Sequence, residues 1–172
     1  MTLHEIMRRR RSVRVYTGEA IPDDVLNEVI RAGLLAPSSR GQKPCEFYVV
    51  RNKDILAALA GVKKAGGAML KDADAAIVVS ASEQKADTWT EDCSIALTYM
   101  DLAAAEAGLG SCWVQIHLRK DADGADAEAN VRKILHLGDD MRIAGILSLG
   151  VSAQVLPEHA EADPESDSVH RI

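Results

Sequence analysis

The sequence predicts a sandwich of helices around one β-sheet, in the α+β or α/β class. Short apolar runs typical of buried strands alternate with segments of helical periodicity along the chain. This order is typical of proteins in which helices cover a single sheet. The 172 residues suit one domain over residues 1–172, and the 47% of apolar residues are ample for its core.

The first predicted helix lies at the N-terminus. Leu3, Ile6 and Met7 recur at the spacing of an amphipathic helix, which should turn this apolar stripe toward the core. The β-branched residues Val13 and Val15 favour extended chain, so the helix should end before them.

A second helix should run from about Pro22 to the residue before Pro37. Proline is favoured in a first helical turn, and it disfavours helical conformation in the residue before it. A polar loop over residues 38–44 and a buried strand over residues 47–50 should follow.

The next segments should hold two short helices and a second strand. Residues 53–61 have the pattern of a helix, and residues 65–72 that of a weaker one interrupted by two glycines. The apolar run over residues 75–80 predicts the strand.

The longest predicted helix covers residues 90–107 and is apolar on nearly every side. Such a helix belongs either in a core or at a subunit interface. Thr88 and Glu91 fit a capping box at its start, and Gly108 suits its C-terminal end.

The last predicted elements are a third strand over residues 111–116, a helix over 126–136 and a fourth strand over 143–151. After Pro157 the chain is acidic and poor in apolar residues. We therefore expect residues 157–172 to be a polar arm, whether a loop, a segment laid on a partner, or disordered.

Composition argues against several classes of protein. The sequence contains no run of about 18 apolar residues, so no membrane span is expected. The N-terminus also lacks the apolar stretch of a secretory signal peptide, because charged residues begin at His4 and Glu5. We therefore expect a cytoplasmic protein. Cys45, Cys93 and Cys112 form no metal-ligand spacing, so they should be reduced, buried thiols and no metal is expected.

A cluster of arginines stands near the N-terminus of this acidic chain. The net charge is −6, yet five of the seven residues over positions 8–14 are arginines. Helical phase places Arg10 near the centre of the apolar stripe and Arg11 at its flank, whereas Arg8 and Arg9 point away. An inward arginine needs an anionic or carbonyl partner, because an unpaired buried charge is costly.

The inward part of this cluster is a candidate phosphate site. It comprises Arg10, Arg11, Ser12 and Arg14. The planar guanidinium fork matches phosphate oxygens. The alternative is a solvated basic helix end whose arginines pair with carboxylates such as Glu5. No basic stripe with interleaved aromatic residues accompanies the cluster, so we expect no nucleic-acid partner.

Three segments together resemble the nitroreductase family of flavin mononucleotide (FMN) enzymes. Residues 10–14 resemble its N-terminal phosphate-binding signature, and residues 36–44 resemble its Ala-Pro-Ser-Ser loop before the first core strand. The third segment consists of Glu91-Asp92, the apolar helix that follows and residues 108–113, which resemble its Gly-Leu-Gly-Ser-Cys-Trp turn. The segments stand in the same order as in the family, and the resemblance covers about residues 4–157.

The resemblance implies an α+β, three-layer α/β/α sandwich with a mostly antiparallel central sheet, in an interlocked homodimer. It implies FMN at the subunit interface, reduction by NAD(P)H, and ping-pong transfer of electrons to a nitroaromatic, quinone or similar acceptor. The flavin rather than a catalytic side chain would carry the chemistry. A flavin storage or regulatory protein without such turnover is the alternative.

The resemblance also implies which residues hold the phosphate and ribityl chain. This phosphate set consists of Arg10, Arg11, Ser12 and Arg14. The family has a further basic phosphate ligand near the C-terminus, and here Arg171 is the favoured candidate over His170.

Two further sets should surround the flavin ring. The loop set, expected from the other subunit, consists of Pro37, Ser38, Ser39, Arg40 and Gly41. The turn set should line the far side of the ring through backbone groups and consists of Leu109, Gly110 and Ser111. The family loop usually continues Asn-x-Gln-Pro-Trp. Here the amide side chains are missing, and the smaller Cys45 stands at the tryptophan position.

Three side chains near these sets have two interpretations each. Trp113 lies in an apolar strand and is better read as core than as a stacking platform. Trp89 could roof the pocket or act as a hydrophobic staple at a helix start. Arg40 could border the substrate or be a solvated loop residue.

Overall fold

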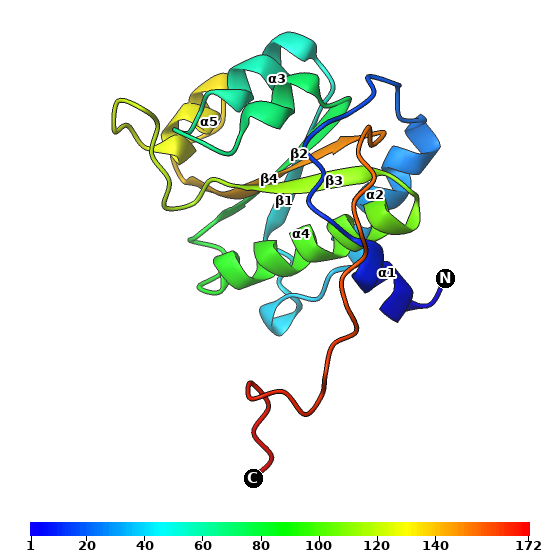
Figure 1. Cartoon of the computed structure of the whole chain (residues 1–172). Coiled ribbons are helices and arrows are strands. Elements are labelled where there is room, and N and C mark those ends of the chain that lie inside the picture. Colours follow the sequence, from blue (N-terminus) through cyan, green and yellow to red (C-terminus); the bar gives the residue numbers. More distant parts are fainter.

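The computed structural model describes all 172 residues and contains one four-stranded sheet (Figure 1). The strand order is β1-β2-β4-β3, and every neighbouring pair is antiparallel. The strands are β1 (Cys45–Val50), β2 (Ala75–Ser82), β3 (Gly110–Gln115) and β4 (Met141–Gly150). The sheet is therefore wholly antiparallel.

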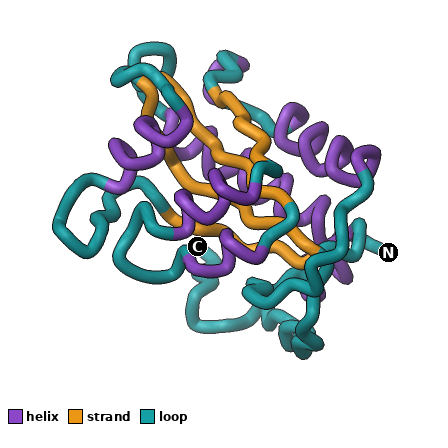
Figure 2. The backbone as a smooth tube through the Cα atoms, turned by 90° about the horizontal axis from the view of Figure 1, so that it is seen from above, coloured by secondary structure: helices purple, strands orange, loops and turns teal.

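Helices cover both faces of the sheet, and most loops lie at its rim (Figure 2). One layer contains α1 (Leu3–Arg9), α2 (Asp23–Leu35) and α4 (Trp89–Glu106). The opposite layer contains α3 (Lys53–Ala60), the 3₁₀ helix η2 (Ala68–Asp72) and α5 (Ala127–Leu135). A further 3₁₀ turn, η1 (Ser39–Gly41), follows α2. No helix is both long enough and apolar enough to cross a membrane.

The central strand β2 explains why two cores form. All its residues are buried, and successive side chains of a strand point to opposite faces. Ala76 and Val78 accordingly belong to the apolar cluster under α3 and α5, whereas Ile77 and Val79 belong to the cluster under α2 and α4. This is the three-layer α/β/α sandwich of the α+β class that the sequence predicted.

Helix α1 begins with a capping box formed by Thr2 and Glu5. The Glu5 N–H donates to Thr2 Oγ1 at 3.2 Å, and the Thr2 N–H donates to Glu5 Oε2 at 2.7 Å. The apolar stripe of α1 is only partly packed. Ile6 is buried, but Leu3 and Met7 are 58% and 47% exposed, contrary to the predicted inward stripe.

Helix α4 is buried on one side and open on the other. Ile95 and Tyr99 remain 37% and 42% exposed, although Leu97 and the other inward residues are fully enclosed. The capping box predicted at its start is wrong. The hydroxyl of Thr88 caps no backbone N–H and instead donates to Asp92 Oδ2 at 3.2 Å.

The arginine-bearing segment after α1 runs along the end of the sheet. The Val13 N–H donates to the carbonyl of Ser111 at 2.8 Å, and the Thr17 N–H donates to that of Val151 at 2.9 Å. The Ala153 N–H donates back to the Val15 carbonyl at 3.0 Å. These bonds hold the segment between the start of β3 and the exit of β4.

Candidate functional site

The arginine cluster lines two adjoining hollows of about 330 and 360 Å³ at the C-terminal end of α4. Arg10, Arg11 and Gln154 line both hollows. Leu109 and Ser111 of the turn set line the first hollow, and the remaining phosphate-set residues, Ser12 and Arg14, line the second. The structure therefore brings the phosphate set and the turn set together.

Arg10 stands directly after α1 and reaches a buried carboxylate. Its Nη1 lies 3.4 Å from Oδ2 of Asp101, and the two side chains are 28% and 11% exposed. The Ser111 hydroxyl donates to Oδ1 of the same carboxylate. Burial raises the pKa of Asp101, although the bond from Ser111 and the charge of Arg10 oppose that rise. The carboxylate partner of Arg10 is thus Asp101 and not Glu5.

Arg11 and Arg14 have no carboxylate partner. Arg11 Nη1 donates to the carbonyl of Pro157, and Arg14 Nη1 donates to the carbonyl of Ser12 at 3.2 Å. Each guanidinium carries five N–H donors, so both retain donors for an anion. In a chain of net charge −6, two cations without a carboxylate partner beside one hollow are the strongest electrostatic signal of a ligand.

The other two arginines of the cluster face the C-terminal arm. Arg8 contacts Glu161 at 3.0 Å and Glu158 at 3.5 Å, and Arg9 lies 4.0 Å from Glu158. These are the exposed ion pairs that the alternative interpretation expected. The cluster is therefore divided by its partners: Arg8 and Arg9 pair with carboxylates of the arm, whereas Arg10, Arg11 and Arg14 do not. Arg10, Arg11 and Arg14 line the hollows, and Arg9 also borders the first one.

The turn set packs closely against the segment that carries the phosphate set. Gly108 has φ +76°, a left-handed conformation that favours glycine and ends α4. A Cβ at Gly110 would lie 2.7 Å from Cγ1 of Val13 and 3.2 Å from Cβ of Ser152. Glycine at position 110 therefore lets three segments meet beneath the hollows.

The loop set lies near the other end of α4. The Ser39 N–H donates to Asp92 Oδ1 at 2.8 Å, and the Lys43 N–H donates to Ser38 Oγ at 2.8 Å. A small pocket of about 110 Å³ between α2 and α4 is lined by Pro37, Ser38 and their neighbours. The exposed Arg40 lies 3.8 Å from Asp87, so in the single chain it is a solvated loop residue.

One chain does not bring the loop set to the arginine cluster. The loop set contacts Asp92 and the cluster contacts Asp101, nine positions further along α4, which is roughly 13 Å at 1.5 Å per residue. Arg171 pairs with Glu165 at 2.6 Å within the arm and makes no contact with the cluster.

Two residues of the site were not anticipated from the sequence. Asp101 anchors Arg10, and its signal was a lone acid in the middle of an otherwise apolar stretch of helix. Gln154 accepts hydrogen bonds from the N–H groups of Arg14 and Val15 at 2.9 and 3.1 Å. A glutamine in a polar loop carries no comparable signal, so only the structure could identify it.

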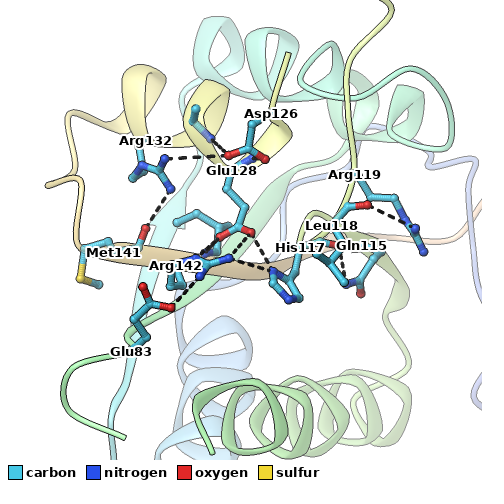
Figure 3. Close-up of polar contacts among 12 residues, drawn as sticks. Glu83, Gln115, His117, Leu118, Arg119, Asp126, Glu128, Arg132, Met141 and Arg142 are labelled. Atoms are coloured by element: carbon cyan, nitrogen blue, oxygen red, sulfur yellow. Dashed lines mark hydrogen bonds and ion pairs between the residues drawn. The ribbon is translucent and has the colours of Figure 1, made fainter. Parts of the chain in front are cut away.

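A second polar cluster ties α5 to the start of β4 (Figure 3), and its members line neither hollow. Glu128, which is 3% exposed, lies 2.7 Å from His117 Nδ1 and accepts bonds of 2.9 and 3.0 Å from Arg142. Arg142 also donates to Glu83 at 2.6 Å. Each charged group has a partner of opposite sign or a hydrogen-bond partner, so this cluster serves the fold.

The structure separates the two tryptophans from the arginine hollows. Trp89 is buried at the start of α4, with Arg142 over its ring at 5.1 Å and His117 in an edge contact at 4.8 Å. Trp113 packs against the apolar cluster under α2 and α4, and its indole N–H donates to Gln115 at 3.0 Å. Trp113 is thus part of the core, as predicted, and Trp89 is a helix-start residue.

The residues around the hollows fit the groups of FMN. A phosphate is bound by cations and hydrogen-bond donors, which Arg11, Arg14 and Ser12 supply. A flavin ring needs an apolar surface, which Val13, Leu109 and their neighbours give the first hollow. The hollows also have the size of small-molecule sites, which span about 300–1,000 Å³.

Comparison with known protein families places this geometry in context. Residues 7–68 and 61–151 match the family model described as the Nitroreductase family. A protein of Archaeoglobus fulgidus, provisionally named NADH dehydrogenase/NAD(P)H nitroreductase, is 33% identical over 168 residues. That match covers 94% of this chain and 92% of the relative.

Solved structures share the same architecture. An FMN-dependent nitroreductase of Clostridium difficile R20291 superposes with a TM-score of 0.90 at 38% identity, covering 96% of both chains. A Desulfovibrio desulfuricans protein, provisionally named a nitroreductase and solved in complex with FMN, has a TM-score of 0.79 at 23% identity. It covers 100% of this chain and 97% of its own, and at that identity it supports the fold alone.

Proposed function

Because this chain belongs to the nitroreductase family, we propose that it is an FMN-dependent oxidoreductase that passes electrons from NADH or NADPH to an electron-poor acceptor. Nitroaromatics and quinones are the proposed acceptor classes. The observation that carries the proposal is the pair Arg11 and Arg14, two cations without carboxylate partners beside the glycine turn. When bound, FMN supplies the redox chemistry of its isoalloxazine ring.

The residues of the phosphate set have distinct proposed roles. Arg11, Arg14 and Ser12 bind the phosphate, because their donors are not engaged by carboxylates. Arg10 is fixed by Asp101 and directs its remaining donors toward the ribityl chain and ring. A fixed positive charge there also favours negative charge that develops on the ring during reduction.

The turn set and loop set are proposed to enclose the ring from two sides. The turn set borders the ring with backbone groups; it consists of Leu109, Gly110 and Ser111. The side chain of Ser111 is not free for the ring, because its hydroxyl is already bound to Asp101. The loop set, Pro37 to Gly41, borders it from the other subunit. The nicotinamide nucleotide and the electron acceptor are proposed to use the same opening one after the other, so the reaction is ping-pong.

We propose that the active form is a homodimer in which the loop set of one protomer completes the site of the other. The separation of the loop set from the arginine cluster within one chain supports this arrangement. Exposed apolar side chains on one layer also support it, since isolated chains rarely leave several uncovered together. They are Leu3, Met7, Leu34, Leu35, Ile95 and Tyr99. Arg171 is proposed to serve the partner's phosphate, because it lies away from its own cluster.

Absorbance of the purified protein tests the proposal. We expect the bands of oxidised flavin, stoichiometric FMN on release, bleaching by NADH or NADPH, and recovery of the bands on adding a nitroaromatic or a quinone. A colourless protein that takes up no added FMN would refute flavin binding. A flavin that neither nucleotide bleaches, or that no acceptor reoxidises, would instead favour a storage or regulatory protein.

A further inference from the structure

Two thiols meet at the small pocket beside the loop set. Cys45 is the first residue of β1, Cys93 lies near the start of α4, and their Sγ atoms are 3.6 Å apart. Cys93 is fully buried, whereas Cys45 is half-buried and lines the pocket of about 110 Å³. In the single chain, Cys45 is thus the more accessible thiol and Cys93 lies behind it.

The pocket in front of Cys45 suits a short aliphatic group. Its apolar wall is formed by Leu34, Ala36, Pro37, Phe47 and Ala96. Its volume of about 110 Å³ is roughly a third of that of each arginine hollow, so it suits a small disulfide better than a ring system. Lys43 also lines this pocket, so the pocket carries a positive charge beside the negative charge of Asp92.

The two thiols differ in acidity because of their contact. The hydrogen bond with Cys93 lowers the pKa of Cys45, although burial and the charge of Asp92 oppose this effect. The same hydrogen bond, followed by burial, raises the pKa of Cys93 far above its ordinary value. Since the thiolate is the nucleophile in thiol chemistry, the accessible Cys45 is also the thiol that reacts first.

We propose that Cys45 and Cys93 form a thiol–disulfide exchange site for small aliphatic disulfides. The Cys45 thiolate attacks one sulfur of the disulfide, which forms a mixed disulfide and releases the other half as a thiol after protonation. Cys93 loses its proton and attacks Sγ of Cys45, which releases the second half as a thiol. The two protein thiols are oxidised by two electrons to one disulfide, and the small disulfide is reduced to two thiols.

The geometry supports the second step as well as the first. A disulfide bond is about 2.05 Å long, so the two sulfurs, which are 3.6 Å apart, must approach by about 1.5 Å to form one. Mixed-disulfide formation removes the Cys45 thiolate and its hydrogen bond, both of which hold the pKa of Cys93 high. The buried Cys112 has no thiol partner and serves as an internal control.

The test uses the full-length, flavin-loaded protein, reduced and then exposed to hydroxyethyl disulfide without any nicotinamide nucleotide. Intact mass, alkylation of residual thiols and peptide mapping are measured. We expect wild type to lose two hydrogens, to form a Cys45–Cys93 disulfide and to release two equivalents of mercaptoethanol. Cys93→Ser should stop at a stable adduct on Cys45, Cys45→Ser should not react, and Cys112→Ser should behave as wild type.

Three outcomes would overturn the proposal. They are alkylation of both Cys45 and Cys93 in treated wild type, an adduct placed on Cys112, and failure of a folded Cys93→Ser protein to hold an adduct. Circular dichroism shows whether each variant is folded, and the wild-type peptide map decides the question even if a variant is not. Because no nucleotide or acceptor is added, the result is independent of the proposed oxidoreductase activity.

Discussion

Arg8 and Arg10 are two residues apart in sequence, yet their guanidinium groups meet different environments. Arg10 reaches the buried carboxylate of Asp101 and lines both hollows, whereas Arg8 reaches Glu158 and Glu161 of the exposed arm. Exposed ion pairs of the second kind contribute little to stability. The two residues therefore form a matched pair for testing which arginines serve the ligand.

We expect Arg10→Ala to weaken FMN binding by about 1.5–3 kcal/mol, the scale of hydrogen bonds to charged groups. Arg8→Ala should leave the affinity almost unchanged, because Arg8 lines neither hollow. Titration of the apoprotein with FMN, followed by flavin fluorescence, measures both dissociation constants. Equal losses in the two variants would mean that the cluster acts only as a diffuse positive field.

Gly110→Ala should destabilise the protein by about 1–3 kcal/mol, the usual cost of overpacking. The added Cβ would stand 2.7 Å from Val13 Cγ1 and displace the segment that carries the phosphate set. Gly61→Ala is the control, because its Cβ would meet only ordinary contact at 3.6 Å. Urea unfolding gives both stabilities. If the two substitutions cost the same, close packing at position 110 is not the reason for glycine there.

The sequence predicted the inward position of Arg10, but for a reason that is only partly right. The stripe of Leu3, Ile6 and Met7 was expected to face the core, yet two of these side chains are exposed in the single chain. Arg10 turns inward because the helix ends at Arg9 and because the carboxylate of Asp101 on α4 pairs with its guanidinium. Helical phase finds a direction, but it cannot find a partner 91 positions away in the sequence.

At the scale of elements, Glu128 joins α5 to β4. Burial alone would raise its pKa, but hydrogen bonds from Arg142, His117 and the Ile143 N–H outweigh burial and lower the pKa to about 2. A carboxyl whose pKa is lower in the folded than in the unfolded protein stabilises the fold above the unfolded pKa. That stabilisation is lost as the pH falls toward the folded pKa.

Wild type should therefore lose about 3 kcal/mol of unfolding free energy through this carboxylate between roughly pH 5 and pH 2. Glu128→Gln lacks this titration, so it should be less stable than wild type near neutral pH, and the difference should shrink on acidification. Urea unfolding of both proteins across this range measures the difference. A gap that stays constant with pH would show that the charge of Glu128 contributes nothing.

The positions of most helices and strands followed from periodicity, but the caps at helix starts did not. Thr2 with Glu5 and Thr88 with Glu91 have the same spacing, yet only the first pair forms a capping box. Thr2 has the extended backbone that a capping residue needs, whereas Thr88 has ψ 23° and its hydroxyl is taken by Asp92. Capping depends on backbone angles and competing acceptors, which sequence spacing does not contain.

At the scale of the whole molecule, the exposed face of α4 predicts association. Tyr99→Glu should raise the dissociation constant of the proposed dimer at least about tenfold, or about 1.4 kcal/mol, by placing a charge in an apolar contact. Ala57→Glu adds the same charge to an exposed position of α3 on the opposite layer and should not matter. Sedimentation at several concentrations compares the two variants. An unaltered Tyr99→Glu dimer would place the interface elsewhere.

The arrangement of the sheet and the grouping of the site lay beyond local patterns. Nothing in the strand over residues 75–82 indicates that it pairs with the last strand of the chain, Met141–Gly150. The family resemblance supplied the architecture, and it also anticipated that the phosphate set and turn set belong together. It did not reveal Asp101 or Gln154, because it assigned a role to neither residue.

The bonds between residues 14–17 and residues 151–154 also constrain the order of events during synthesis. The N–H of Arg14 donates to Gln154, which is 140 positions later in the chain. The N-terminal arginine segment is therefore synthesised early, but it can be fixed in place only after almost the whole core has been synthesised. The ligand site is therefore expected to assemble only when translation is nearly complete. Nascent chains ending before Ser152 should capture no flavin, which a series of stalled or truncated chains can show.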